Sequence, residues 1–90
     1  MKIIDNIKKE QKRRANQRKF EEILDKAVAR RQTESLGIKL DVEGWAYVHE
    51  LIVAMQDVEN VYGDMIMLER AVAADKRYVL NEDRSKVRAL

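Results

Sequence analysis

The chain has 90 residues, with 18 Lys and Arg, 16 Asp and Glu, a single His, and neither Cys nor Pro. This length fits one small domain with a single core, and the lack of Cys excludes disulfides and thiolate metal sites. No apolar run is long enough to span a membrane, and the N-terminal residues lack the apolar stretch of a signal peptide. We therefore expect a cytoplasmic protein without membrane contact, cofactor, small-molecule substrate or metal site.

The charge is unevenly distributed along the chain, although the formal net charge is only +2. Residues 1–31 carry 11 basic and 5 acidic residues, residues 32–75 carry 2 and 9, and residues 76–90 carry 5 and 2. The three blocks therefore have net charges of +6, −7 and +3. If each block stays together in the fold, the surface is polarised, although long helices are also commonly solvated by Lys and Arg.

The first 33 residues predict a long helix, because no Gly precedes Gly37 and residues 20–28 place apolar side chains at helical spacing. Residues 8–19 have only Ala15 as an apolar residue, so we assign 1–19 as a basic N-terminal helical extension. Gly37 is expected to end this helical region. Residues 38–40 then alternate as a short strand, and residues 41–44 form a turn.

The remaining residues predict two helices and a β-hairpin. Residues 45–48 are expected to be extended, a second helix starts near His49 and ends before Gly63, and Asp64 caps a third helix over 65–74. Strands at 78–80 and 86–90 enclose a turn at 81–85. The order of helix, strand, two helices and hairpin predicts an α+β winged helix over residues 20–90, with three helices and a small β-wing.

Two separated segments resemble a known enzyme family. Residues 29–45 read ARRQTESLGIKLDVEGW, and residues 75–89 read DKRYVLNEDRSKVRA. They are similar to the patterns L-R-H-x-P-E-x-L-G-L-x-L-D-x-x-G-W and D-K-x-R-F-x-L-S-E-D-G-x-x-I-R-A of the RNA 2′-phosphotransferases, which move a 2′-phosphate from spliced RNA to NAD⁺. The resemblance covers residues 20–89 and implies the winged-helix lobe of that family.

The resemblance also assigns individual residues. Arg30 matches the Arg of the family's Arg-His pair, Arg31 stands in place of the His, and Arg88 matches the Arg just before the family's R-A-x-Q-G-H-S segment. The resemblance implies that the regions of Arg30 and Arg88 converge on RNA phosphate. Arg31 is always cationic and cannot shuttle a proton, and the family's NAD⁺ lobe would follow Leu90. From this we expect no enzymatic activity; a third and weaker possibility is that the chain is a piece of a longer transferase. Arg84 replaces a Gly in the wing turn, so strain is expected there.

Two binding functions follow as hypotheses. The first is a non-catalytic protein-interaction or regulatory module, of the kind that phages and mobile elements direct at host proteins, which binds a protein partner or a second copy. Its surface would combine apolar and adaptable side chains with one cation: Ile3, Ile4, Ile7, Ile66, Met67 and Arg70. Alternatively, Ile3, Ile4 and Ile7 fold back and cover the third helix.

The second hypothesis is binding of RNA or DNA phosphates without base recognition, through the basic first helix and the wing. The residues expected to do this are Arg13, Arg14, Arg18, Lys19, Arg30, Arg31, Lys76, Arg77, Lys86 and Arg88. The third helix carries acidic residues and few groups that read base edges, so it is not expected to enter a DNA groove. Phe20 and Trp45 are expected in the core, so this hypothesis depends on charge alone.

Overall fold

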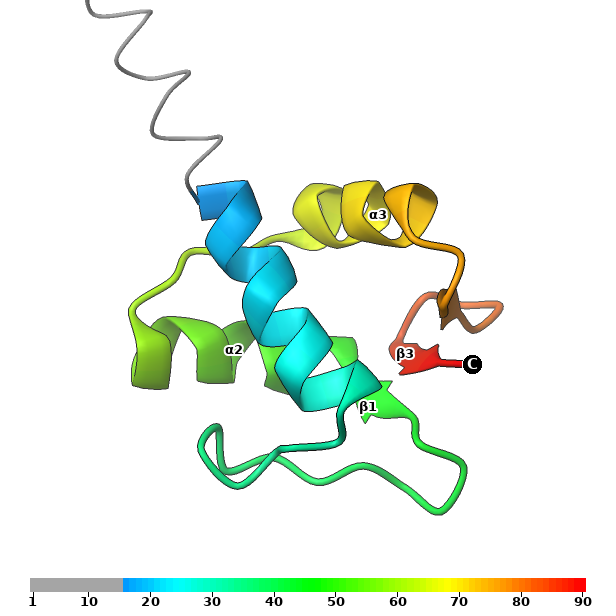
Figure 1. Cartoon of the computed structure of the whole chain (residues 1–90), viewed down its shortest axis with the longest axis horizontal. Helices are drawn as coiled ribbons and strands as arrows, with labels where there is room; N and C mark the ends of the chain where they lie inside the picture. The colour runs from blue at the N-terminus through cyan, green and yellow to red at the C-terminus, as the bar shows by residue number, and fades with distance from the viewer. Residues whose placement is uncertain (1–15) are drawn as a thin grey trace, which may run out of the picture.

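The computed structural model describes residues 16–90 as an α+β fold in which three helical segments pack against one face of a small antiparallel sheet (Figure 1). Residues 16–24 are α-helical and continue into the π-helical turn η1 (Asp25–Ala29). After a long loop come β1 (Ala46–Tyr47), α2 (Val48–Glu59) and α3 (Met65–Ala74). The strands β2 (Tyr78–Leu80) and β3 (Lys86–Ala89) form the hairpin. The predicted α+β class of winged-helix type is confirmed.

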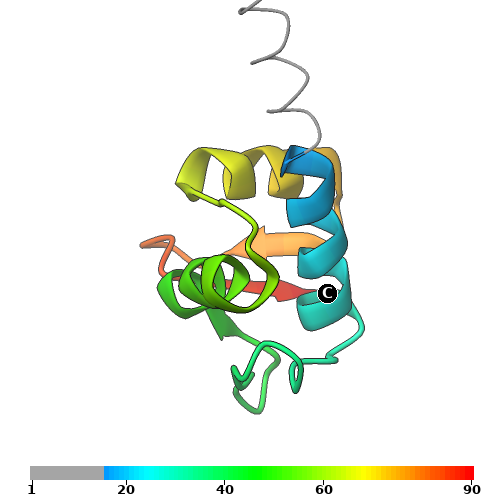
Figure 2. The ribbon, with the colours of Figure 1, turned by 90° about the vertical axis from the view of Figure 1, so that its left-hand side faces the viewer.

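The sheet has the order β1-β3-β2 with antiparallel pairing throughout. Ala46 pairs with Val87 and Tyr47 with Lys86, while Val79 on β2 pairs with Arg88. Figure 2 shows the hairpin strands between α3 above and the loop of residues 30–45 below. The central strand β3 belongs to the second family-like segment, and it pairs with β1, which directly follows the first.

The core lies between the first helix, α2, α3 and one face of the sheet. Phe20, Leu24, Leu51, Leu68 and Val87 are fully buried in it. The predicted apolar stripe of the first helix is therefore correct at Phe20 and Leu24. On α3 the buried residues are Met67, Leu68 and Ala71.

Helix α3 begins and ends where the sequence predicted. Asp64 caps it, because its carboxylate accepts a hydrogen bond of 2.9 Å from the backbone N–H of Met67. Helix α2 ends earlier than expected, at Glu59, since Asn60 adopts the left-handed conformation with φ 53°. Gly63 has a different role: a Cβ there would lie 2.5 Å from the Phe20 ring, so only Gly fits.

Two predictions about the first half of the chain are wrong. The first helix ends at Ala29 instead of residue 33, because Arg31 turns the chain with φ 57° and Gln32 N–H bonds back to the Lys26 carbonyl. Residues 38–40 do not form a strand; the extended partner of β3 is β1. Residues 1–15 lie outside the described part of the chain, and with them most of the predicted extension 1–19.

The wing turn has the conformation that the sequence indicated. Arg84 has φ 61°, the left-handed region that favours Gly. Asp83 stabilises this turn by accepting hydrogen bonds from the backbone N–H and the hydroxyl of Ser85, which lower the pKa of Asp83. Within residues 16–90, no helix is both long and apolar enough to cross a membrane.

Candidate functional site

The end of the first helix presents two consecutive arginines in unusual backbone geometry. In a π-helical turn each N–H bonds the carbonyl five residues earlier, and here the Arg30 N–H donates to the Asp25 carbonyl at 2.9 Å. The same spacing brings Arg30 Nε to 3.2 Å from Asp25 Oδ2. Arg31 follows in a left-handed conformation, which is costly for a residue with a Cβ and often marks a functional position.

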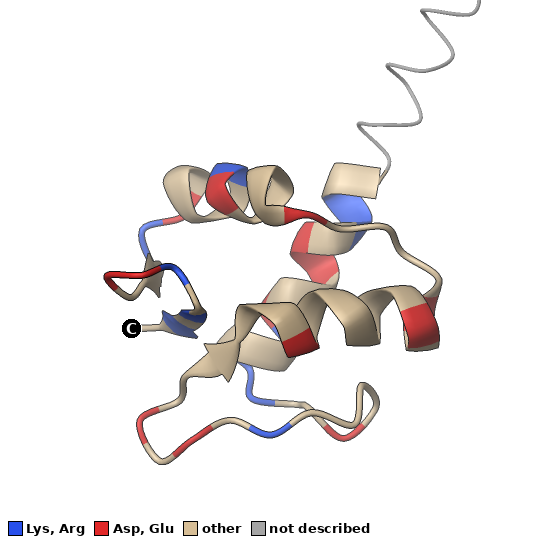
Figure 3. Ribbon diagram, turned by 180° about the vertical axis from the view of Figure 1, so that it is seen from behind, with Lys and Arg blue, Asp and Glu red and all other residues tan. Residues whose placement is uncertain are grey.

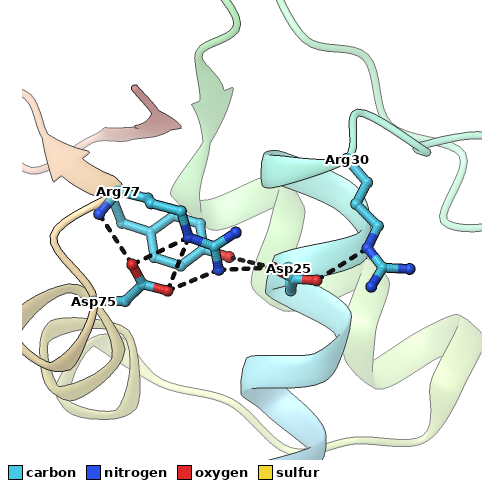
Figure 4. Close-up of polar contacts among 5 residues, drawn as sticks. Asp25, Arg30, Asp75 and Arg77 are labelled. Carbon is cyan, nitrogen blue, oxygen red and sulfur yellow. Dashed lines mark hydrogen bonds and ion pairs between the residues drawn. The ribbon is translucent and has the colours of Figure 1, made fainter.

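Asp25 is the centre of an ion-pair network that joins the first helix to the start of β2 (Figure 4). Besides Arg30, it accepts a hydrogen bond of 2.9 Å from Arg77 Nη2 and one of 3.4 Å from the Tyr78 hydroxyl. Arg77 also contacts Asp75, whose Oδ2 lies 2.7 Å from Arg77 Nη2. Two carboxylates therefore balance two guanidinium groups, and Arg30 and Arg77 add little net charge to this surface.

The pKa values around this network follow from its contacts. The side-chain hydrogen bond from Arg77 lowers the pKa of Asp75 below its usual 3.8, and Asp75 and Asp25 raise the pKa of Arg77. Burial, followed by the negative charge of Asp25, raises the pKa of Tyr78 to about 12. Asp75 and Arg77 are therefore charged, and Tyr78 is neutral, at neutral pH.

Arg31 and Arg88 approach the same loop from different parts of the chain. The Arg31 guanidinium lies against the backbone of Gly44, where an added Cβ would come within 3.1 Å of Arg31 Nη2. The Arg88 guanidinium lies over the Trp45 ring, 4.8 Å from its centroid. The π-helical turn η1 also packs against β3. The two family-like segments, residues 29–45 and 75–89, therefore lie next to each other around the loop of residues 41–45.

These two arginines are the least neutralised of the three that the resemblance singles out. Among residues 16–90, Arg31 is in no ion pair, and the carboxylate nearest Arg88 is that of Glu43, at 4.0 Å. Glu43 also accepts a hydrogen bond of 3.2 Å from Trp45 Nε1. Figure 3 shows basic residues on the hairpin and at the end of the first helix, and acidic ones on α2 and the loop.

The other predicted nucleic-acid residues are scattered. Arg18, Lys19 and Lys76 are exposed, and Lys86 lies over the Tyr47 ring on the same strand as Arg88. Arg13 and Arg14 lie outside the described residues. The sequence reasoning missed the acidic partners Asp25 and Asp75. Asp25 is 52 residues away from Arg77, whereas its position five residues before Arg30 and the position of Asp75 two residues before Arg77 were local signals.

The predicted partner-binding residues fall into three groups. Ile66 is 61 % exposed and Arg70 is also exposed, and both line a groove of about 390 Å³ beside Gln17 and Tyr62. Met67 is buried, so the exposure expected for it is wrong. Ile3, Ile4 and Ile7 lie outside the described residues, so the alternative in which they cover α3 stays a prediction.

Comparison with known proteins shows which proteins the chain is similar to. No model of a known protein family matches the chain. Matching curated proteins include probable RNA 2′-phosphotransferases from Fusobacterium nucleatum subsp. nucleatum (38 % identical over 65 residues), Flavobacterium johnsoniae (41 % over 64) and Burkholderia pseudomallei (36 % over 64). The chain is related to the RNA 2′-phosphotransferases. The matches cover 69–70 % of this chain but 34–36 % of each relative.

The comparison corrects one expectation. We expected no enzymatic activity, but all three of these relatives are named as transferases. The expectation of no activity was based on the Arg in place of a His at position 31 and on the length of 90 residues. These two features are therefore not sufficient to exclude a role in catalysis. The chain spans about one third of the length of the curated relatives that it matches.

Proposed function

We propose that this chain binds RNA phosphate groups as the RNA-contacting part of a 2′-phosphotransferase activity, with Arg31 and Arg88 as the contacting cations. The observation that carries this proposal is the approach of both guanidinium groups to the loop of residues 41–45, with little compensation from carboxylates. The names of the relatives support RNA that carries a 2′-phosphate as the ligand.

The chemistry of these side chains suits a phosphate. Arg presents several N–H donors in a planar fork that matches the oxygens of a phosphate group. An Arg guanidinium offers hydrogen-bond donors and no acceptor, so the contribution of Arg31 is charge and hydrogen bonding. Arg30 is already paired with Asp25, and a phosphate must compete with that carboxylate for it.

The test is RNA binding by single variants at several salt concentrations. Arg31→Gln and Arg88→Gln each remove a charge while keeping a long polar side chain, and Arg70→Gln on α3 is the matched control. Each lost phosphate contact should reduce the slope of log affinity against log salt by about 0.7 for single-stranded RNA. Arg70→Gln should leave the slope unchanged. Equal slopes for all four proteins would refute the proposal.

A second proposed function is association with another protein chain through α3, because Ile66 and Tyr62 are 61 % and 58 % exposed beside the groove described above. Exposed apolar side chains around a groove are typical of contact surfaces. If the partner is a second copy, sedimentation should show association that Ile66→Asp abolishes and Val53→Asp on α2 does not. A monomer at all concentrations would exclude a second copy as the partner.

A further inference from the structure

The outer face of the sheet carries two aromatic rings, each paired with a cation. Side chains alternate between the faces of a strand, and Ala46 and Val87 are buried on the core side. Tyr47 and its partner Lys86 therefore lie on the opposite face, with Lys86 Nζ 5.0 Å from the Tyr47 ring centroid. Trp45, two residues before Tyr47 and directly before β1, and Arg88, two residues after Lys86 on β3, repeat the arrangement at 4.8 Å.

This face is accessible and does not belong to the core. Tyr47 is 52 % exposed, and Trp45 is half-buried and absent from the core cluster. The prediction that Trp45 is a core residue is therefore wrong. The expected core ring Phe20 is fully buried, so Phe20 belongs to the core whereas Trp45 and Tyr47 belong to this outer face.

The pairing of exposed rings with cations has a clear chemical use. Single-stranded nucleic acids bind where bases stack on aromatic side chains while Lys and Arg hold the backbone phosphates. Residues two apart on a strand are separated by about 6.8 Å, which places Trp45 and Tyr47 side by side as neighbouring rings. Glu43 lies at the Trp45 end, so the more favourable stacking position is Tyr47.

We propose that the outer face of β1 and β3 is a base-stacking site for single-stranded RNA, in which a base stacks on Tyr47, the next base lies against Trp45, and Lys86 and Arg88 hold the intervening phosphate. This deepens the proposed phosphate-binding function and rests on it for the role of Arg88. The stacking itself depends on the rings, and a duplex, whose bases are already stacked, should not use it.

The experiment compares a short single-stranded RNA with an abasic ribose-phosphate oligomer of the same length, which has the same phosphates but no bases. Trp45 is the only Trp in the chain, so its fluorescence reports directly on this face. RNA should quench it and the abasic oligomer should not. Tyr47→Ala should weaken RNA binding about 5- to 100-fold, and Tyr62→Ala, at the other strongly exposed Tyr, should leave it unchanged.

The outcomes separate this proposal from the one it rests on. Equal affinity for both oligomers, with no effect of Tyr47→Ala, overturns the stacking site and leaves phosphate binding intact. A loss in Tyr47→Ala without any effect of Arg31→Gln or of salt supports stacking and overturns the phosphate proposal. Absence of binding by either oligomer overturns both. Circular dichroism of Tyr47→Ala establishes that the variant is folded.

Discussion

Replacing Gly63 by Ala tests the packing of the first helix against the turn between α2 and α3. A methyl group on Gly63 would lie 2.5 Å from Phe20 Cε2 and 2.7 Å from Cδ2. Carbon atoms in contact prefer about 3.5–4.0 Å, so the ring would have to retreat by about 1 Å within a core where Phe20 is fully buried. Overpacking of this kind costs about 1–3 kcal/mol.

For a domain of this size, the loss corresponds to a fall in Tm of roughly 5–20 °C. Thermal unfolding followed by circular dichroism measures it. The matched control is Gly63→Ala in a Phe20→Leu background, where the smaller side chain makes room, so the second substitution should cost less there. An unchanged Tm for Gly63→Ala, or the same cost in both backgrounds, would refute the close-packing argument.

Three further predictions concern the cap, the ion-pair network and Tyr78. Asp64→Ala should destabilise the protein by about 1 kcal/mol through loss of the α3 cap, whereas Asp57→Ala on the exposed face of α2 should be nearly neutral in denaturant unfolding. Asp25→Asn should release Arg30 and so strengthen RNA binding, while Arg77 stays paired with Asp75; weaker binding would show that Asp25 positions Arg30 instead of competing for it. Because the pKa of Tyr78 is raised from 10 to about 12, its contribution to stability should be complete below pH 10 and lost as the pH rises through 12. Tyr78→Phe should flatten that loss in unfolding measured across this range, and an identical decline in both proteins would contradict it.

The elements predicted most accurately are those with local signals. Helix α3 follows an Asp cap, and β2 begins where it was expected after a short turn. The errors have non-local causes. Residues 38–40 have the alternation of a strand, but β3 pairs with β1 instead. The end of the first helix at Ala29 depends on the left-handed Arg31, whose side chain packs against Gly44.

The candidate site was predicted in part. Arg31 and Arg88 were named from the resemblance, and the structure brings both to one loop. The neutralisation of Arg30 and Arg77 by Asp25 could not be read from the sequence, since it depends on the first helix meeting the start of β2. Its residue type alone predicts that Trp45 is in the core. Its position on the outer face follows from the register of β1 against β3.

Arg31 and Arg88 are proposed to hold an RNA phosphate at the loop of residues 41–45. The most direct measurement compares binding of one short RNA with and without an internal 2′-phosphate, using the wild type and the Arg31→Gln, Arg88→Gln double variant. We expect the wild type to prefer the 2′-phosphorylated RNA and the double variant to lose that preference. Equal binding of both RNAs by the wild type, or a preference that survives in the double variant, would contradict the claim.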